Sequence, residues 1–264
     1  MEADLRVRAG GDGEPMLLLL HGLGATGDVW AGWWPELANR WPGRWIAPDL
    51  PGHGGSPVLP EYTFDALAEA VRPLVTGDGP TVVVGHSLGG VVALALAGRL
   101  PVAAVVGLGI KVAWSDADLE RAGAMADRPV AWFDSADEAA ARHLRVSGLA
   151  GLLTPDDPAV RAGIHETGGR WRLALDPRAF GVGKPDMTAL VAGTSAAVTL
   201  ARGEHDPMNT DDQLRQWGVP VVTLAGLGHN AHVESPRHCL ELLADHVTLG
   251  STGPGRTHDS PGRP

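Results

Sequence analysis

The chain has 264 residues, a length that suits one large α/β domain or a core with a small inserted lobe. Hydrophobic residues make up 44%, enough for a sizeable core. The net charge of −10 argues against a general binder of nucleic acid or anionic membranes, because both functions need clustered Lys and Arg. A single cysteine, Cys239, excludes an internal disulfide and a cysteine-based zinc site, and makes a reducing cytoplasm the simplest compartment. Residues 1–15 lack the pattern of a signal peptide, and no apolar stretch is as long as a membrane span, so we expect a soluble protein with no membrane partner.

Short apolar runs alternate with segments of helical periodicity in the first part of the chain. This alternation predicts an α/β fold with a parallel sheet and helices on both of its faces. A short edge strand is also expected at residues 5–8. The expected strands are 16–20, 44–48, 82–84 and 102–110, and the expected helices are 30–40, 63–75 and 91–100.

The pattern changes between residues 111 and 193, where three helical segments are predicted with no convincing strand among them. We interpret this region as a helical lobe inserted between two strands of the sheet. The C-terminal segment, residues 250–264, is almost free of apolar residues and is predicted to be disordered. The expected lobe helices are 116–125, 136–146 and 158–165, the later strands are 196–201 and 219–225, and a closing helix covers 237–247. The core thus comprises residues 1–110 and 194–249, with the lobe at 111–193.

A G-x-S-x-G motif at residues 85–89 lies between an apolar strand and an Ala/Leu-rich helix. In such a turn the serine adopts a strained backbone conformation, and the positions two before and two after it must be small. Gly85 and Gly89 meet this requirement. Ser87 is therefore the candidate nucleophile, at a helix N-terminus where unpaired N–H groups favour negative charge.

A serine hydroxyl needs a base to activate it, and the base needs an orienting acid. Asp206 and His229 each follow one of the two later strands. Because neighbouring parallel strands end at the same edge of a sheet, these side chains should converge on Ser87. Glu204 is the alternative acid and His232 the alternative base. Glu204 lies two residues closer to the end of its strand than Asp206 does, so we prefer Asp206 as the acid. We prefer His229 as the base because it directly follows a strand and a Gly-rich turn.

The other histidines have structural interpretations. His21 and His53 are expected to brace glycine loops through hydrogen bonds, and His86 is expected to support the turn or to line the pocket. His205 and His232 would have to join His229 to form a metal site, but the chain has no His-x-x-x-His helix with carboxylate support. We expect no metal and no other cofactor.

Taken together, these motifs resemble those of the α/β-hydrolase fold superfamily over roughly residues 5–248. The order of the three candidate residues, Ser then Asp then His, is that of this family. The resemblance implies that the lobe is a variable cap over the active site, and that the backbone N–H groups of Leu23 and Leu88 form an oxyanion hole. The matching segments are residues 21–24, 49–54, 85–90, 203–206, 228–229 and 234–236.

Ser87 at the nucleophile position narrows the expected reaction. Family members that open epoxides or displace halides carry Asp there, so the resemblance favours a serine hydrolase of a carboxylic ester or lactone. Hydrolysis of a carbon–carbon bond is less favoured, because His86 and Asn230 stand where such enzymes often have Asn and Trp. Amide cleavage, perhydrolysis, an acyltransferase or lyase reaction, and non-catalytic ligand binding remain alternatives.

Tryptophan is unusually frequent, with nine residues against three Phe and one Tyr. Several of these lie in the lobe or after the proposed oxyanion loop, and Met208 follows the candidate acid. Any one Trp can instead pack the lobe on the core. Together they favour a small apolar substrate as the binding partner, contacted by Trp30, Trp114, Trp132 and Met208.

Overall fold

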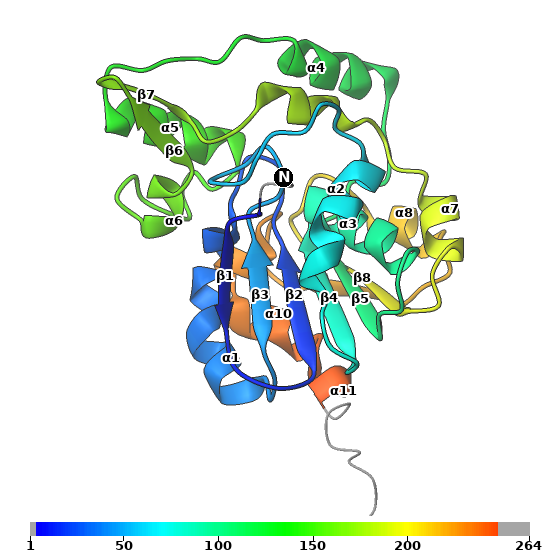
Figure 1. Ribbon diagram of the computed structural model, residues 1–264. Helices are drawn as coiled ribbons and strands as arrows, with labels where there is room; N and C mark the ends of the chain where they lie inside the picture. The colour runs from blue at the N-terminus through cyan, green and yellow to red at the C-terminus, as the bar shows by residue number, and fades with distance from the viewer. Residues whose placement is uncertain (1–3, 248–264) are drawn as a thin grey trace, which may run out of the picture.

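A seven-stranded sheet forms the centre of the computed structural model, which describes residues 4–247 (Figure 1). The strand order is β1-β3-β2-β4-β5-β8-β9, and β1 alone in this sheet runs antiparallel to its neighbour. This confirms the mostly parallel sheet expected from the sequence. The strands are β1 (Val7–Gly10), β2 (Met16–Leu20), β3 (Trp45–Pro48), β4 (Thr81–His86), β5 (Ala104–Leu108), β8 (Ala197–Gly203) and β9 (Val221–Leu224).

Helices cover both faces of this sheet (Figure 1). One face carries η1 (Gly27–Trp33), α1 (Trp34–Arg40), α9 (Ala231–Glu234) and α10 (Pro236–Glu241), with α11 (Ala244–Val247) after them. The other face carries α2 (Phe64–Val71), η2 (Arg72–Leu74), α3 (Leu88–Ala97), α7 (Met187–Ala192) and α8 (Asp211–Arg215). No helix within residues 4–247 has both the length and the apolar character needed to cross a bilayer.

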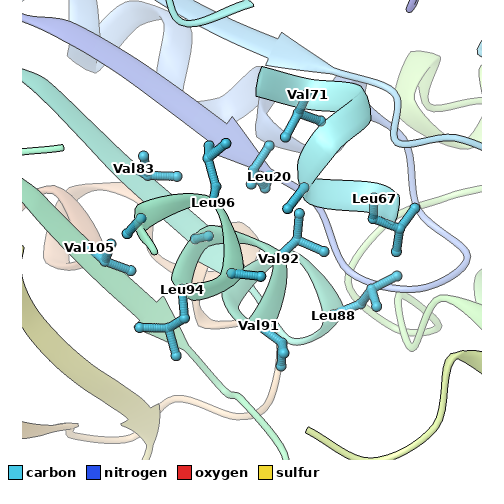
Figure 2. Packing of buried hydrophobic residues seen from close by; sticks show 14 of the residues in the cluster. Leu20, Leu67, Val71, Val83, Leu88, Val91, Val92, Leu94, Leu96 and Val105 are labelled. Carbon is cyan, nitrogen blue, oxygen red and sulfur yellow. The ribbon is translucent and has the colours of Figure 1, made fainter. Parts of the chain in front are cut away.

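The core follows from side-chain alternation along the buried strands. In β2, Leu18 and Leu20 belong to the apolar cluster on the α3 face, whereas Leu17 and Leu19 belong to the cluster on the α1 face. Every residue of α3 is buried, so this helix packs against the sheet, α2 and neighbouring loops at once. Figure 2 shows its side chains between strand residues and those of α2.

The segment between β5 and β8, here named the insert (residues 111–193), differs from the expected all-helical lobe. It contains α4 (Asp116–Ala126), α5 (Ala136–Val146), α6 (Pro158–Arg161), η3 (Pro177–Val182) and α7. It also contains a two-stranded hairpin of β6 (Ile164–Thr167) and β7 (Arg170–Leu173), so the expectation of no strand is wrong. The two-residue turn Gly168–Gly169 has positive φ at both positions, as such hairpins require.

Several boundaries also differ from the expected ones. The edge strand lies at Val7–Gly10, and the helix expected from residue 30 begins as the 3₁₀ segment η1, with Pro35 in the first turn of α1. The helix expected at 158–165 ends at Arg161, and the closing helix is divided into α10 and α11. The tail expected to be disordered lies outside the described residues.

Backbone hydrogen bonds fasten the insert over the carboxyl-end edge of the sheet (Figure 1). The Gly54 N–H donates to the Ala174 carbonyl, and the Asp176 N–H donates to the Gly52 carbonyl, each over 2.7 Å. The Tyr62 hydroxyl also donates to the Asp176 carboxylate over 2.9 Å. The loop after β3 therefore holds one side of the insert.

Candidate functional site

The turn between β4 and α3 holds Ser87 in a conformation that side chains rarely adopt. Its backbone has φ 50° and ψ −113°, and among residues 4–247 it is the sole non-glycine residue with positive φ. Such a conformation costs on the order of 1–3 kcal/mol and persists only when surrounding structure enforces it. Here the Ser87 N–H donates to the Leu108 carbonyl of β5 over 2.8 Å, which fixes the turn against the neighbouring strand.

Glycines on either side of Ser87 allow strand and helix to come this close. A Cβ at Gly85 would lie 2.2 Å from the Gly89 carbonyl oxygen, and one at Gly89 would lie 2.3 Å from the Leu20 carbonyl oxygen. Both distances are far inside van der Waals contact, and both obstacles are backbone atoms that cannot rotate away. The requirement for small residues at these positions, predicted from the sequence, is thus confirmed.

Asp206 and His229 form a pair at the same edge of the sheet. Asp206 follows β8 and His229 follows β9, and His229 Nδ1 lies 3.1 Å from each carboxylate oxygen of Asp206. The Asp206 side chain is buried, and its Oδ1 also accepts from the Met208 N–H. An Nδ1–H donated to this carboxylate leaves Nε2 of His229 as the free, basic nitrogen.

The two alternative residues occupy other environments. Glu204 is exposed, and its carboxylate accepts from the Gly226 N–H over 2.8 Å. His232 is buried with its ring 4.6 Å from that of Trp30 and 4.2 Å from that of His86, and burial lowers its pKa to about 3. The structure therefore gives His229, rather than His232, both a carboxylate partner and a partly exposed ring.

His86 connects the turn to the loop that carries His229. Its Nε2 donates to the His229 carbonyl over 3.0 Å, and the two rings lie 4.7 Å apart. Within residues 4–247 the Ser87 hydroxyl has no hydrogen bond, to His229 or to any other group. A hydrogen bond between the Ser87 hydroxyl and His229 would therefore require at least one of the two side chains to move, as is common for site residues before substrate is bound.

An apolar cavity of about 170 Å³ opens beside Ser87. Leu23 and Leu88 line it, and neither of their backbone N–H groups donates to an acceptor within residues 4–247. Unpaired N–H groups beside a candidate nucleophile can donate hydrogen bonds to an oxygen on which negative charge develops. Other walls of this cavity are Phe64, Val91, Lys111, Trp114, Ala122, Phe180, Val182, Gly183 and Pro185.

The four side chains expected to contact substrate are placed differently. Trp114 lines the cavity, with Lys111 Nζ 4.9 Å from its ring centroid. Trp30 is completely buried between Trp33 and His232, so its expected contact with substrate is wrong and it serves the core. Trp132 and Met208 are each 39% exposed and lie outside the cavity lining.

Three residues hold the site together through contacts that the sequence does not reveal. Gly109 has φ +60°, and a Cβ there would lie 3.1 Å from Asp206 Oδ2 and 3.2 Å from His229 Nδ1. The Asn209 side chain joins the acid loop to the chain after β5, donating to the Ile110 carbonyl and accepting from the Val112 N–H. The Asn230 amide donates to the Gly148 carbonyl of the insert. No local motif marks these positions, because their partners are distant in sequence.

Three buried histidines lie between the core and the insert. The His21 Nε2 accepts from the Leu50 N–H, and the His53 Nδ1 donates to the Pro51 carbonyl, so both brace loops as expected. His143 of α5 is the third, and its Nε2 has no partner within residues 4–247. Burial lowers the pKa of His21 and of His143 to about 4, and that of His53 to about 3. All three are therefore uncharged at neutral pH.

Within residues 4–247, no group of three or more His, Cys, Asp or Glu residues is arranged to hold a metal ion.

Comparison with known proteins identifies a family. A model described as the alpha/beta hydrolase family matches residues 17–238. The curated lipase LipV of Mycobacterium tuberculosis is 36% identical over 228 residues, which are 81% of this chain and 84% of LipV. A pimeloyl-[acyl-carrier protein] methyl ester esterase of Methylococcus capsulatus is 41% identical over 87 residues, 33% of each chain.

Solved structures share the fold over almost the whole chain. E-2-(acetamidomethylene)succinate hydrolase superposes with a TM-score of 0.73 at 23% identity, covering 94% of this chain and 95% of its own. An esterase of Mycobacterium tuberculosis superposes with a TM-score of 0.72 at 22% identity, covering 94% and 90%. At these identities the likeness concerns the fold alone.

The buried histidines predict a loss of stability in acid. The unfolded chain takes up protons as the pH falls below about 6.5, whereas the folded protein resists until the pH nears 4, so the free energy of unfolding falls between these values. A His143→Gln variant removes one such titration and should reduce the loss between pH 7 and pH 4 by on the order of 3 kcal/mol. Urea denaturation at several pH values measures this. His205→Gln, at an exposed position, is the control, and equal pH dependence in all three proteins would contradict the assignment.

Because β4 and α3 touch at Gly85, adding one methyl group there should lower the melting temperature. Gly85→Ala should lower the melting temperature by on the order of 5–10 °C or prevent folding, because the new Cβ meets the Gly89 carbonyl. Gly123→Ala in α4 is the matched control, since a Cβ there meets nothing within 4 Å. Its melting temperature should stay the same or rise slightly. Equal melting temperatures for the two variants would show that the turn tolerates a larger residue.

Proposed function

The chain belongs to the alpha/beta hydrolase family, and from this premise we propose that it is a serine hydrolase of a small apolar carboxylic ester or lactone. Its likeness to a lipase over most of both chains supports an esterase-type reaction. One observation carries the assignment of residues: a strained serine and a carboxylate–imidazole pair share one edge of the sheet. The apolar cavity beside Ser87 supports an apolar substrate.

In the proposed reaction, the Ser87 hydroxyl attacks the carbonyl carbon while His229 Nε2 removes its proton. Asp206 accepts the hydrogen bond from His229 Nδ1, which holds the ring in the useful tautomer and stabilises the imidazolium that forms. The N–H groups of Leu23 and Leu88 donate hydrogen bonds to the carbonyl oxygen and stabilise the negative charge that develops on it.

His229 next acts as an acid, and then again as a base toward water. Protonated His229 gives its proton to the leaving alcohol, and the acyl group stays on Ser87 as an ester. A water molecule, deprotonated by His229, then attacks the acyl carbon. The acid is released, and the proton returns to the Ser87 oxygen. The side chains proposed for these steps come from this chain alone, with no metal or cofactor.

Replacement of the nucleophile tests this proposal. Ser87→Ala should lower kcat for a p-nitrophenyl ester by at least about 10³-fold, since the variant cannot form the acyl-enzyme. The measurement is initial rates with butyrate and octanoate esters, together with a melting curve to verify folding. Ser195→Ala, an exposed serine, is the control and should retain full activity. Undiminished turnover by the Ser87 variant would overturn the proposal.

Gly109 gives a subtler prediction. A Gly109→Ala variant places a methyl group about 3 Å from both Asp206 and His229 at a φ that favours glycine, so the pair must shift by a few tenths of an ångström. We expect kcat to fall by about tenfold or more while KM changes little, because misplacement of the base affects the transition state. Steady-state kinetics on the folded variant measure this split. A change in KM alone would assign Gly109 to substrate binding instead.

A further inference from the structure

A second, larger cavity lies within the insert. It has a volume of about 410 Å³ and is bounded by the end of α4, the chain that follows it, α5, β7 and η3. Most of its wall is apolar, with Val130, Phe133, Leu173, Leu175 and Phe180 among the lining residues. The volume is within the range of small-molecule binding sites.

Two arginines distinguish this cavity from the one beside Ser87. Arg128 and Arg142 both line it, and no acidic residue does. Neither guanidinium has a hydrogen-bond or ion-pair partner among residues 4–247, whereas Arg161 and Arg178 of the same insert each pair with aspartate. Arg128 is exposed and Arg142 is half-buried, so both guanidinium groups are accessible to a ligand.

The two cavities are neighbours. Phe180 lines both of them. Val146, which lines the larger cavity, has its Cγ1 2.9 Å from the point that a Cβ of Gly24 would occupy. Gly24 directly follows Leu23, which lines the cavity beside Ser87. Phe180 is therefore part of the boundary between the two cavities, and a ligand that starts at Ser87 would reach the space near the two arginines by displacing this side chain.

We propose that the larger cavity binds an anionic group that the substrate carries at the end of an apolar stem. The apolar wall would cover the stem, and Arg128 and Arg142 would bind the anion. Guanidinium groups form paired, charge-assisted hydrogen bonds with carboxylate and phosphate oxygens, which makes either anion a suitable ligand. This inference rests on the proposed hydrolase function, and it narrows the substrate class to esters that are apolar near the scissile bond and negatively charged farther away.

Matched ester pairs test the inference by turnover. One member is the mono-p-nitrophenyl ester of a straight-chain dicarboxylic acid, and the other is the p-nitrophenyl ester of the monocarboxylic acid with equal chain length. For the wild type we expect kcat/KM to favour the charged member at longer chain lengths. In an Arg128→Gln/Arg142→Gln double variant this ratio should fall by about tenfold. An Arg142→Lys variant should keep part of the preference.

Arg145→Gln is the control, because Arg145 is an exposed residue of the same helix α5 and lies outside the cavity lining. It should leave the ratio unchanged. If the double variant keeps the wild-type ratio, the anion site is wrong even though hydrolysis of the neutral esters continues. Failure of the wild type to cleave any ester would instead count against the proposed function.

Direct binding separates the two anion types and does not depend on turnover. Calorimetry on the full chain would compare decanoate, decyl phosphate and decanol with the wild type and with the double variant. We expect one of the anions to bind the wild type at least fivefold more tightly than the double variant, while decanol binds both equally. The favoured anion then identifies carboxylate or phosphate as the ligand. Equal binding of all three compounds by both proteins would overturn the inference.

Discussion

The strained backbone at Ser87 determines how β4 and α3 meet and where the serine hydroxyl lies. A positive φ at a serine is unfavourable by itself, on the order of 1–3 kcal/mol, and α3 provides the compensation because all its residues are buried. Glycines at 85 and 89 remove the atoms that would otherwise separate strand from helix. The bond from the Ser87 N–H to the Leu108 carbonyl then fixes the turn to the next strand. The hydroxyl is thereby presented at the edge where β8 and β9 also end.

Electrostatics around His229 follow from burial. The Asp206 carboxylate is the anion next to its ring, and it is removed from solvent. His86 and His232 flank the same region, and burial lowers the pKa of each, to about 3 for His232 and well below its ordinary value for His86. Both stay neutral at physiological pH, so a proton acquired by His229 meets an attractive carboxylate and no opposing imidazolium. His86 and His232 therefore pack beside His229 without adding charge. His86 also donates a hydrogen bond to the His229 carbonyl.

Features that depend on neighbouring residues, such as strands and the turns after them, could be predicted from the sequence. Features that depend on contacts between distant residues could not. The sequence predicts that Ser87, Asp206 and His229 lie at one edge of the sheet, because each follows a recognisable strand and parallel strands end at one edge. Their catalytic roles stay a proposal. Trp30 shows the opposite case: its position after a glycine loop suggested a pocket, but only packing against His232 of α9 shows that it is buried. The β6–β7 hairpin was missed because Ile164 continued an apolar pattern that began in α6.

Stoichiometric labelling by a fluorophosphonate, with the modified peptide located by mass spectrometry, tests whether Ser87 is an activated nucleophile. Such reagents phosphonylate a serine only where a base and an oxyanion site activate it. We expect one label per chain, on Ser87, and a labelling rate that falls sharply in an Asp206→Asn variant. Modification of another residue, or a rate unaffected by that substitution, would contradict the assignment of these three side chains to one catalytic unit.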